Sequence, residues 1–482
     1  MQKMQNNRGQ RSQQGEEAKT ENAKKRATMR YSVIEGSAWS VMSGFGDSFL
    51  IPFALALGAN DAHIGFLKSL PQLANSLTQE VGAWLTDKVR NRLGMIMVFA
   101  TLEALTWLAL LSIPFLLPIP GDLRIYAVIA LAIVYSFFGA IHHPAWVSLM
   151  ADIVPDNMRG GYFGNRNKIT GAAALASLLI AGYVLGVFDN VFVGFAAIFA
   201  VAALGRLTSV YFFSKHYEPP YSPAPPRKHG HNLKKLLASD FGRYLSFSTF
   251  LLFAVNLAGP FFAVYMLRDL SLGYFFYALI LGGEAVTRLL AMPYWGQLGD
   301  KFGNRTIMFT AGFLVPIIPL LWLVNQNPFF LFCIQVFSGF IWAGFDLAAF
   351  NYFLDSTTHV DRAANTAHLN LANGFAAFAG ASIGGLIALG TQADKVVFIG
   401  LSGIPLLFLL SGVLRLLFSV WLAPRLNEVK QVEPVSERAF ALRVLTVYPM
   451  KGFTHEIVGM WRTAKSARER VKKIVLRRRG TG

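Results

Sequence analysis

The sequence predicts an all-α integral membrane protein with twelve transmembrane helices in two six-helix bundles. The first observation is composition: 54% of the 482 residues are hydrophobic and only 15% are charged, against roughly a quarter charged in soluble domains. The second is that the apolar residues form charge-poor blocks of about 20 residues, the length that crosses the hydrocarbon core of a bilayer. The third is that the second half of the chain repeats landmarks of the first.

The apolar blocks follow one another along the chain, and proline and glycine mark many of their ends, as at 118–121 and 325–328. Because the first thirty residues are polar, we expect the first span itself to direct insertion. The expected spans are 33–57, 62–83, 93–117, 125–149, 163–187, 190–213, 243–267, 271–295, 306–325, 328–351, 367–390 and 396–422.

Lysine and arginine are distributed unevenly over the loops between these spans. Only Arg124, Arg268 and Lys395 fall in loops on one side, whereas the other loops and both termini hold many. By the positive-inside rule we expect both termini in the cytoplasm, in a bacterial inner membrane. The net charge of +17 is then an orientation signal and a surface for anionic lipid, rather than a nucleic-acid site.

The longest internal loop is rich in proline and basic residues, which is typical of an extended linker. It divides the chain into two sets of six spans. We therefore expect an N-terminal cytoplasmic tail at 1–30, bundles at 31–213 and 243–422, a cytoplasmic linker at 214–242, and a basic cytoplasmic tail at 423–482.

The two sets of six spans are copies of one another. Residues of the same type recur in the same order at nearly constant spacing, and the small changes of spacing fall in loops. The matching pairs include Pro52 and Pro260, Asp61 and Asp269, Asp87 and Asp300, Asp152 and Asp355, and Arg206 and Arg415. Two parallel repeats related by an axis along the membrane normal form a transporter architecture.

The loop between the second and third spans of the second copy reads GQLGDKFGNR. It resembles the signature loop of the major facilitator superfamily, a transporter family. The matching residues are Gly296, Leu298, Asp300, Lys301, Gly303 and Arg305. The resemblance covers about residues 31 to 424 and implies that family's twelve-helix fold, in which this cluster is a latch on the cytoplasmic gate.

The first copy of this loop keeps Asp87, Lys88 and Arg92 but has Ala83 and Arg90 in place of the two glycines. This predicts a looser turn, since glycine permits tight turns and close approach. A carboxylate in such a loop can accept hydrogen bonds from the N-terminus of a neighbouring helix. The alternative is that the basic residues only hold the loop in the cytoplasm.

A second repeated cluster joins spans four and five, and again spans ten and eleven. It contains Asp152 and Arg159 in the first half, and Asp355 and Arg362 in the second. We expect an ion pair between Asp152 and Arg159 that closes the cytoplasmic end. A purely structural turn is the alternative.

Ionisable residues inside spans are costly, so we expect them to face a cavity or a partner. Asp47 in span one is the first candidate for proton coupling or for a cationic or hydroxylated solute. His142 and His143, Asn256 and Asp346 complete a candidate polar ring, because spans one, four, seven and ten line the cavity of this architecture. A His–Asp pair could shuttle protons; hydrogen-bonded structural roles are the alternative. A shared metal is disfavoured, because adjacent histidines point about 100° apart on a helix.

Other spans also hold charged residues. Glu284 and Arg288 lie at i, i+4, which predicts a self-neutralised pair; alternatively, Arg288 faces the cavity and binds an anionic solute. Glu103 is expected to be structural. Arg206 and Arg415 are expected to extend their charged ends toward the membrane surface.

These features predict a secondary active transporter that moves a small solute by alternating access, with or without proton coupling. A lipid or lysolipid carrier of the same fold is an alternative, and a membrane receptor or enzyme is a third. We expect no enzyme, because CxxC, HExxH and Walker motifs are absent from the sequence. The fifth span also lacks the Gly-Pro-x-x-Gly-Gly run of the family's drug antiporters. We expect a monomer with a small-molecule substrate, membrane lipids and, where coupled, protons as partners, and no cofactor, metal or nucleic acid.

Overall fold

The computed structural model describes residues 2–115, 120–221, 233–358, 361–391 and 401–429, and the elements in these ranges are helical. Linker residues 222–232 and tail residues 430–482 of the expected domains lie outside the described residues. The α-helices are α1 (Gln2–Phe45), α2 (Leu50–Ala56), α3 (Asp61–Val89), α4 (Arg92–Ser112), α5 (Gly121–Ile153), α6 (Arg159–Val187), α7 (Val191–Phe213), α8 (Leu233–Ala238), α9 (Asp240–Ala258), α10 (Phe261–Val264), α11 (Tyr274–Phe302), α12 (Asn304–Leu314), α13 (Ile317–Leu321), α14 (Pro328–Asp355), α15 (Arg362–Thr391) and α16 (Gly403–Leu422).

Ten helical segments in the described ranges are long and apolar enough to cross a membrane. They contain α4, α5, α6, α7, α9, α11, α12, α14, α15 and α16. The more polar helices α1 and α3 pack beside them in the first half, α1 against α6 and α7, and α3 against α5. The arrangement is consistent with the twelve expected spans.

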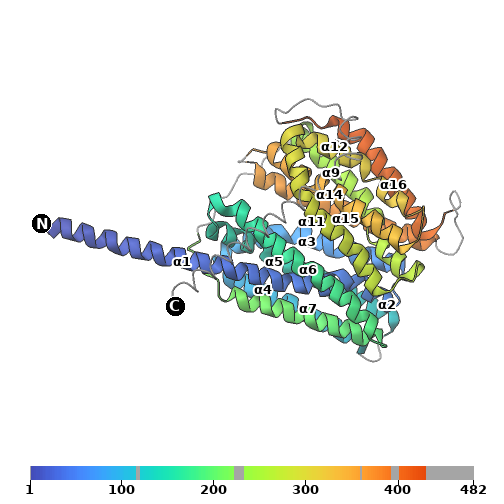
Figure 1. The fold of residues 1–482 in the computed structure, drawn as a ribbon, viewed down its shortest axis with the longest axis horizontal. Helices are drawn as coiled ribbons and strands as arrows, with labels where there is room; N and C mark the ends of the chain where they lie inside the picture. Colours follow the sequence, from blue (N-terminus) through green and yellow to red (C-terminus); the bar gives the residue numbers. More distant parts are fainter. Residues whose placement is uncertain (1, 116–119, 222–232, 359–360, 392–400, 430–482) are drawn as a thin grey trace, which may run out of the picture.

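The helices form two bundles, the first containing α1–α7 and the second α9–α16 (Figure 1). The bundles meet mainly through two pairs of helices, α3 with α15 and α6 with α11. The first pair is spans two and eleven, and the second pair is spans five and eight. Interchanging the two halves converts one pair into the other. The contact between the bundles therefore has the pseudo-twofold relation that the sequence repeat predicts.

The helices of the first and seventh spans are both interrupted, which the expected spans did not include. The first span breaks after α1 at Gly46, makes a 3₁₀ turn at Asp47–Phe49 and continues as α2. The seventh breaks between α9 and α10, at Pro260. Pro52 and Pro260 are a repeat pair, and proline removes the N–H that would bond four residues back. The break in the first span precedes Pro52 and the break in the seventh lies at Pro260, so each copy is interrupted near its proline but not at the same position.

The helix α1 begins at Gln2, so much of the expected 1–30 tail is helical and continuous with the first span. Its first turns project beyond the bundles (Figure 1). Several other helices also run past the expected span ends, with α3 reaching Val89 and α11 reaching Phe302. The extra turns carry polar residues of the connecting loops, which hydropathy alone assigns to the loop.

Glycines in α15 let it pass closely between the two bundles. A side-chain carbon at Gly385 would lie 2.7 Å from the Asp61 carbonyl oxygen and 3.1 Å from Gly65 of α3, whereas Gly380 and Gly384 face α9. These glycines belong to the run GASIGG at 380–385, and small residues of this kind permit close helix crossing. The same run reads G-x-S-x-G, the pattern of a nucleophile elbow. Here it lies within a helix, where the hydroxyls of Ser382 and Ser69 are 2.8 Å apart.

Candidate functional site

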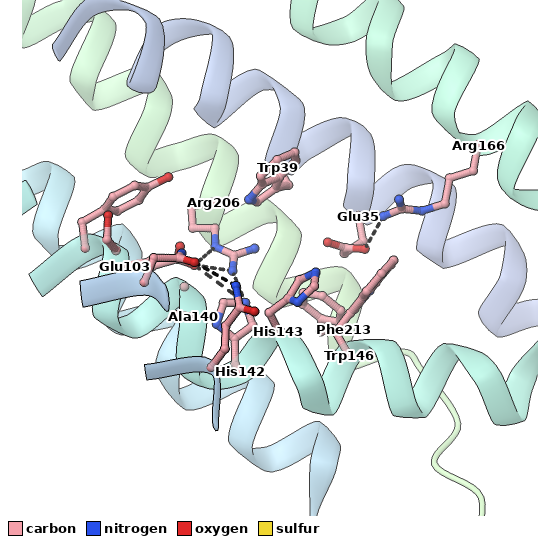
Figure 2. A pocket seen from close by; sticks show the side chains of 15 residues that line it. Glu35, Trp39, Glu103, Ala140, His142, His143, Trp146, Arg166, Arg206 and Phe213 are labelled. Carbon is pink, nitrogen blue, oxygen red and sulfur yellow. Dashed lines mark hydrogen bonds and ion pairs between the residues drawn. The ribbon is translucent and has the colours of Figure 1, made fainter. Parts of the chain in front are cut away.

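A charged pocket of about 460 Å³ lies in the first bundle, at residues contributed by six helices, α1 and α3 to α7 (Figure 2). Glu35, Gln79, Trp146, Arg166 and Phe213 belong to the parts of these helices that lead to one end of the molecule. We call it the basic end, because the loops at 89–92, 153–159 and 302–304 lie there, with Lys88, Arg90, Arg92, Arg159, Lys301 and Arg305 in or beside them. The other end is called the opposite end.

Arg206 of α7 is the centre of the pocket's hydrogen-bond network. Its guanidinium bonds the Glu103 carboxylate of α4 through two nitrogens, one of them at 2.8 Å, and it also contacts Nε2 of His142 of α5 at 2.9 Å. Figure 2 shows the three side chains converging from three helices. Arg206 and Glu103 are almost completely buried. A buried charge pair of this kind is costly to break from one side.

A second pair extends the network toward the basic end. Arg166 of α6 contacts the Glu35 carboxylate of α1 at 3.3 Å, and the other oxygen of Glu35 accepts a hydrogen bond from Ser209 at 3.2 Å. The hydroxyl of Ser209 in turn accepts from Arg206 at 3.0 Å. The five residues Arg166, Glu35, Ser209, Arg206 and Glu103 thus form one chain of contacts across the pocket, with two acids offset by two bases.

The hydrogen bonds of His142 define its protonation state. Nδ1 lies 2.7 Å from the carbonyl oxygen of Phe138, which can only accept, so Nδ1 carries the proton. Nε2 faces the guanidinium of Arg206, which can only donate, so Nε2 accepts. His142 is therefore a neutral imidazole in this arrangement. His143 lines the same pocket and stacks on Trp146, with ring centroids 6.2 Å apart.

Asp47 lies in the 3₁₀ turn at the break in the first span, beyond the pocket toward the opposite end. Its carboxylate interacts with the hydroxyls of Tyr135 and Ser43. Tyr135 also lines the pocket. The structure therefore connects Asp47 to the pocket through one tyrosine rather than placing it on the pocket wall.

A second pocket, of about 300 Å³, lies in the other bundle between α9, α14 and α15. Its acid is Asp346 of α14, which bonds the guanidinium of Arg288 of α11. Arg288 also lies 3.9 Å from Glu284, and Glu284 accepts a hydrogen bond from Gln335 at 3.1 Å. The expected Glu284–Arg288 pair therefore has a third member, Asp346. Asp346 pairs with this arginine of its own bundle and not with a histidine of the other bundle.

Asn256 lies on α9 next to Val255, which lines this pocket, but Asn256 itself is not a lining residue. Its side-chain amide donates to the Leu252 carbonyl of its own helix at 2.9 Å. Its β-carbon packs against Gly380 of α15. The expected ring of Asp47, the two histidines, Asn256 and Asp346 is therefore divided, with the histidines in one pocket and Asp346 in the other.

The two bundles are tied together at the opposite end. Arg268, which follows α10, donates to the Asp61 carboxylate of α3 at 2.7 Å and to its own neighbour Asp269 at 2.8 Å. Asp61 is fully buried. The hydroxyl of Tyr277 donates to the Ser48 carbonyl of the first bundle at 2.9 Å. The sequence marked Asp61 and Asp269 only as a repeat pair, and the partner on the other half could not be read from it.

At the basic end, Arg92 is buried in a cluster formed with the start of the linker. Its guanidinium bonds Asp152 at 2.6 Å and the Pro219 carbonyl at 3.0 Å. Glu218 accepts from the backbone N–H groups of Arg92 and Leu93 at 2.7 and 3.2 Å. The carboxylate at the N-terminus of α4 is thus Glu218, where the sequence suggested Asp87.

Asp87 and Lys88 take other partners near the same loop. The phenol of Tyr221 donates to the Asp87 carboxylate, and the Tyr221 ring stacks under the Arg92 guanidinium at 4.5 Å. Burial is the larger cause, and the hydrogen bond to Asp87 the smaller cause, of the raised pKa of the Tyr221 phenol. This donor therefore stays protonated at neutral pH. The Lys88 ammonium lies over the Trp84 ring at 4.7 Å.

The second copy of the loop repeats this arrangement. Glu428, which follows the last span, accepts from the backbone N–H of Arg305 at 3.0 Å, and the Arg305 side chain donates to the Leu426 carbonyl at 2.6 Å. Gly303 has φ 88° and ψ 151°, which a residue with a side chain rarely adopts. Asp300 and Lys301 lie just before it, in the last turns of α11, and Gly296 lies one turn further back.

The second repeated cluster differs from its expected pairing. Asp152 pairs with Arg92, whereas Arg159 pairs with Asp156 at 2.6 Å and donates to the Ala151 carbonyl at 2.7 Å. The expected Asp152–Arg159 pair is therefore replaced, because Arg92 approaches Asp152 from the neighbouring loop. In the second half, the Asp355 carboxylate likewise accepts a hydrogen bond from a residue at the start of the ninth span, the side-chain amide of Asn304, at 2.9 Å. The Arg362 guanidinium lies 3.4 Å from the Leu354 carbonyl.

The expectation that Arg206 and Arg415 extend to the membrane surface is wrong, since both are buried, with 1% and 2% of their surface exposed. Arg415 donates to the carbonyls of Val315 and Val255 at 3.3 and 3.4 Å. Sequence reasoning also missed Glu35 and Arg166, because both lie at expected span ends, where charges are common. The available signal was that Glu35 and Glu103 are acids in or beside apolar blocks.

Two repeated helical bundles, with charged pockets inside a membrane-spanning fold and joined at one end, define a solute transporter rather than an enzyme. The model of the Major Facilitator Superfamily matches residues 38–256 and 244–478. The chain therefore belongs to the Major Facilitator Superfamily, as the loop motif indicated.

Several known proteins are similar to this chain. The Multi-drug resistance efflux pump PmrA of Streptococcus pneumoniae is 23% identical over 309 residues, which are 60% of this chain and 73% of that protein. Its homolog in Lactococcus lactis is 21% identical over 313 residues, 63% of this chain and 73% of that protein. Among solved structures, a mutant of the nucleoside transporter NupG has a TM-score of 0.63 at 13% identity, covering 83% of this chain and all of that one. The D-xylose-proton symporter has a TM-score of 0.62 at 12% identity, covering 85% and 99%.

Proposed function

We propose that this transporter is a proton-coupled secondary carrier that moves a small solute by alternating access. One observation carries the proposal: both pockets lie toward the basic end, whereas Asp61–Arg268 and Tyr277–Ser48 join the bundles at the opposite end. A solute in either pocket is then exposed to one side of the membrane. Exchange with the other side requires the contacts at the opposite end to separate.

We further propose that the basic end faces the cytoplasm of a bacterial cell. The arginines and lysines of the loops at this end fit the positive-inside rule. The structure would then correspond to an inward-facing state. The two relatives described above are named as efflux pumps, which favours export as the direction of transport.

The charged chain in the first bundle supports proton coupling. Its two acids and two bases balance, so a proton added to Glu35 or Glu103 leaves Arg166 or Arg206 without its full counter-charge. The altered pairing would change how α1 and α4 are held to α6 and α7. Two arrangements of one network, selected by a proton, are what a coupled carrier needs. Asp47 is a third candidate, acting on the pocket through Tyr135.

The proposal is tested with purified protein in vesicles that enclose a pH-sensitive dye. A panel of metabolites and lipophilic drugs is added, and we expect at least one compound to move protons only when the protein is present. In Glu35→Gln and Glu103→Gln variants, and in Asp47→Asn, the compound should still exchange across the membrane while proton movement is lost in at least one. Proton movement that survives in all three would place coupling elsewhere, and the absence of proton movement with every transported compound would reject coupling.

A further inference from the structure

The pocket of the second bundle combines one carboxylate with several aromatic side chains. Asp346 lies among Tyr244, Trp342, Phe345 and Phe350, and Ser248 and Asn373 add two small polar groups. The side chain of Asp346 is one-third exposed, so the acid is reachable from the pocket. Aromatic faces carry partial negative charge and attract cations.

The charges around Asp346 do not balance, in contrast to those of the first bundle. Asp346 and Glu284 share the single guanidinium of Arg288, so when both carboxyl groups are ionised this group of three carries one net negative charge. Gln335 donates a hydrogen bond to Glu284 at 3.1 Å and so supports its charged form. Tyr244 is the other titratable group facing Asp346, and it is neutral as a phenol.

Arg288 has two acceptors on different helices. It bonds Asp346 of α14, and Glu284 lies one turn away on its own helix α11, 3.9 Å from the guanidinium. A small rotation of the arginine side chain would move its bond from Asp346 to Glu284. Asp346 would then be free to accept a different cation without leaving any of the three charges unpaired.

We propose that this pocket binds a small organic cation with an aromatic or apolar body, whose charge replaces Arg288 on Asp346 while Arg288 moves to Glu284. The inference rests on the proposed transport function and names its substrate class. An anion would have to draw Arg288 from both acids and leave two carboxylates uncompensated in a half-buried site, which is costly. A neutral solute would supply no counter-charge for the net negative charge of the three groups.

The test uses two ions of the same shape and opposite charge, tetraphenylphosphonium and tetraphenylborate. Each is titrated calorimetrically into the purified full-length protein in detergent, with detergent alone as the blank. We expect tetraphenylphosphonium to bind at least tenfold more tightly. Asp346→Asn should weaken its binding about tenfold, as loss of a charged acceptor predicts. Asp189→Asn, which removes a charge in the loop between α6 and α7, should leave binding unchanged.

The variant Arg288→Gln distinguishes a displaceable arginine from a purely structural pair. If Arg288 competes with the ligand for Asp346, its removal should tighten tetraphenylphosphonium binding several-fold at pH 8.5. If the Arg288–Asp346 pair is only structural, binding should weaken or the protein should fail to fold, and this result would overturn the exchange. The Asp346→Asn variant keeps the inference testable even then, because Arg288 retains Glu284 as its partner.

The binding assay is independent of transport, so the two proposals can fail separately. Equal affinity for the two ions, or binding that Asp346→Asn does not change, overturns the cation site whatever the vesicle experiment gives. If the cation site is overturned in this way but a neutral metabolite drives proton movement in the vesicles, the carrier function is supported with another substrate class. Selective, Asp346-dependent binding of the cation supports the inference even when the dye assay detects no proton movement.

Discussion

At the scale of single residues, the two buried arginines of the repeat have different surroundings. Arg206 has Glu103 as its counter-charge, whereas Arg415 donates to the backbone carbonyls of Val315 and Val255. The sequence identified the pair by repetition, but hydropathy placed both near the membrane surface. Hydropathy gives depth along one helix and carries no information about which side chain of another helix is nearby, so the partners were not predictable.

We expect Arg206→Met to destabilise the protein by about 3–5 kcal/mol, because it leaves the Glu103 carboxylate buried without its partner. Arg415→Met should cost far less, since its removal leaves carbonyl oxygens that need no counter-charge. Thermal unfolding of the purified variants in detergent measures the difference. The double variant with Glu103→Gln should recover much of the loss from Arg206→Met; equal losses for the two arginine variants would contradict this account.

The two copies of the loop motif also differ at one backbone position. Arg90 closes α3 with φ 56° and ψ 15°, and Gly303 closes α11 with φ 88° and ψ 151°. The looser turn expected from Arg90 is instead a single residue in the left-handed region, which a non-glycine residue can enter at modest cost. The conformation of Gly303 is almost restricted to glycine.

Gly303→Ala should therefore destabilise the protein by about 1–3 kcal/mol. Arg90→Gly should change stability by less than about 1 kcal/mol, because relief of strain is offset by the greater freedom of glycine in the unfolded chain. Chemical unfolding curves of the two variants provide the comparison. A Gly303→Ala variant as stable as the original protein would show that this loop relaxes to another turn.

At the scale of helices, much was predictable and the interruptions were not. The apolar blocks located the spans to within a few residues of helices such as α6 and α7, because length and hydropathy are local properties. The breaks at Gly46 and Pro260 lie inside apolar blocks, where proline alone does not tell a kink from a stop. The contacts of Glu218 and Glu428, which follow the last span of each bundle, were also not predictable, since both residues lie far in sequence from the helix starts that they contact.

The crossing of α3 and α15 yields a prediction at this scale. A Gly385→Val side chain would collide with the Asp61 carbonyl and with Gly65, so the two bundles should separate at this crossing. We expect a cysteine placed at Ser382, in a Cys333→Ser background, to react faster with a maleimide in the Gly385→Val variant. Gly390→Val is the matched control, because a side chain there meets no atom within 4 Å. Equal labelling rates in both variants would show that the crossing adapts without opening.

At the scale of the whole molecule, the repeat creates two similar halves whose contacts are unequal at the two ends. Symmetry predicts which helices meet, as α3 with α15 and α6 with α11 do. It does not predict which end is closed, because that depends on long-range pairs such as Asp61 with Arg268. The free energy difference between the two end states of such a carrier is small, a few kcal/mol, so one buried ion pair between the halves can decide which state is populated.

We therefore expect Asp61→Asn to shift the protein toward a state open at the opposite end. Arg268 would lose a charged acceptor on the other half, worth about 1.5–3 kcal/mol, or roughly a ten- to hundredfold change in population. Pulsed electron spin resonance between labels at Asp189 and Asn327, in a Cys333→Ser background, should give longer distances in this variant. Asp269→Asn is the matched control: Asp269 also bonds Arg268, but it belongs to the same half, so its loss should not separate the bundles. If both variants, or neither, lengthen the distance, the Asp61–Arg268 pair does not hold this end closed, because only a contact between the halves can resist their separation.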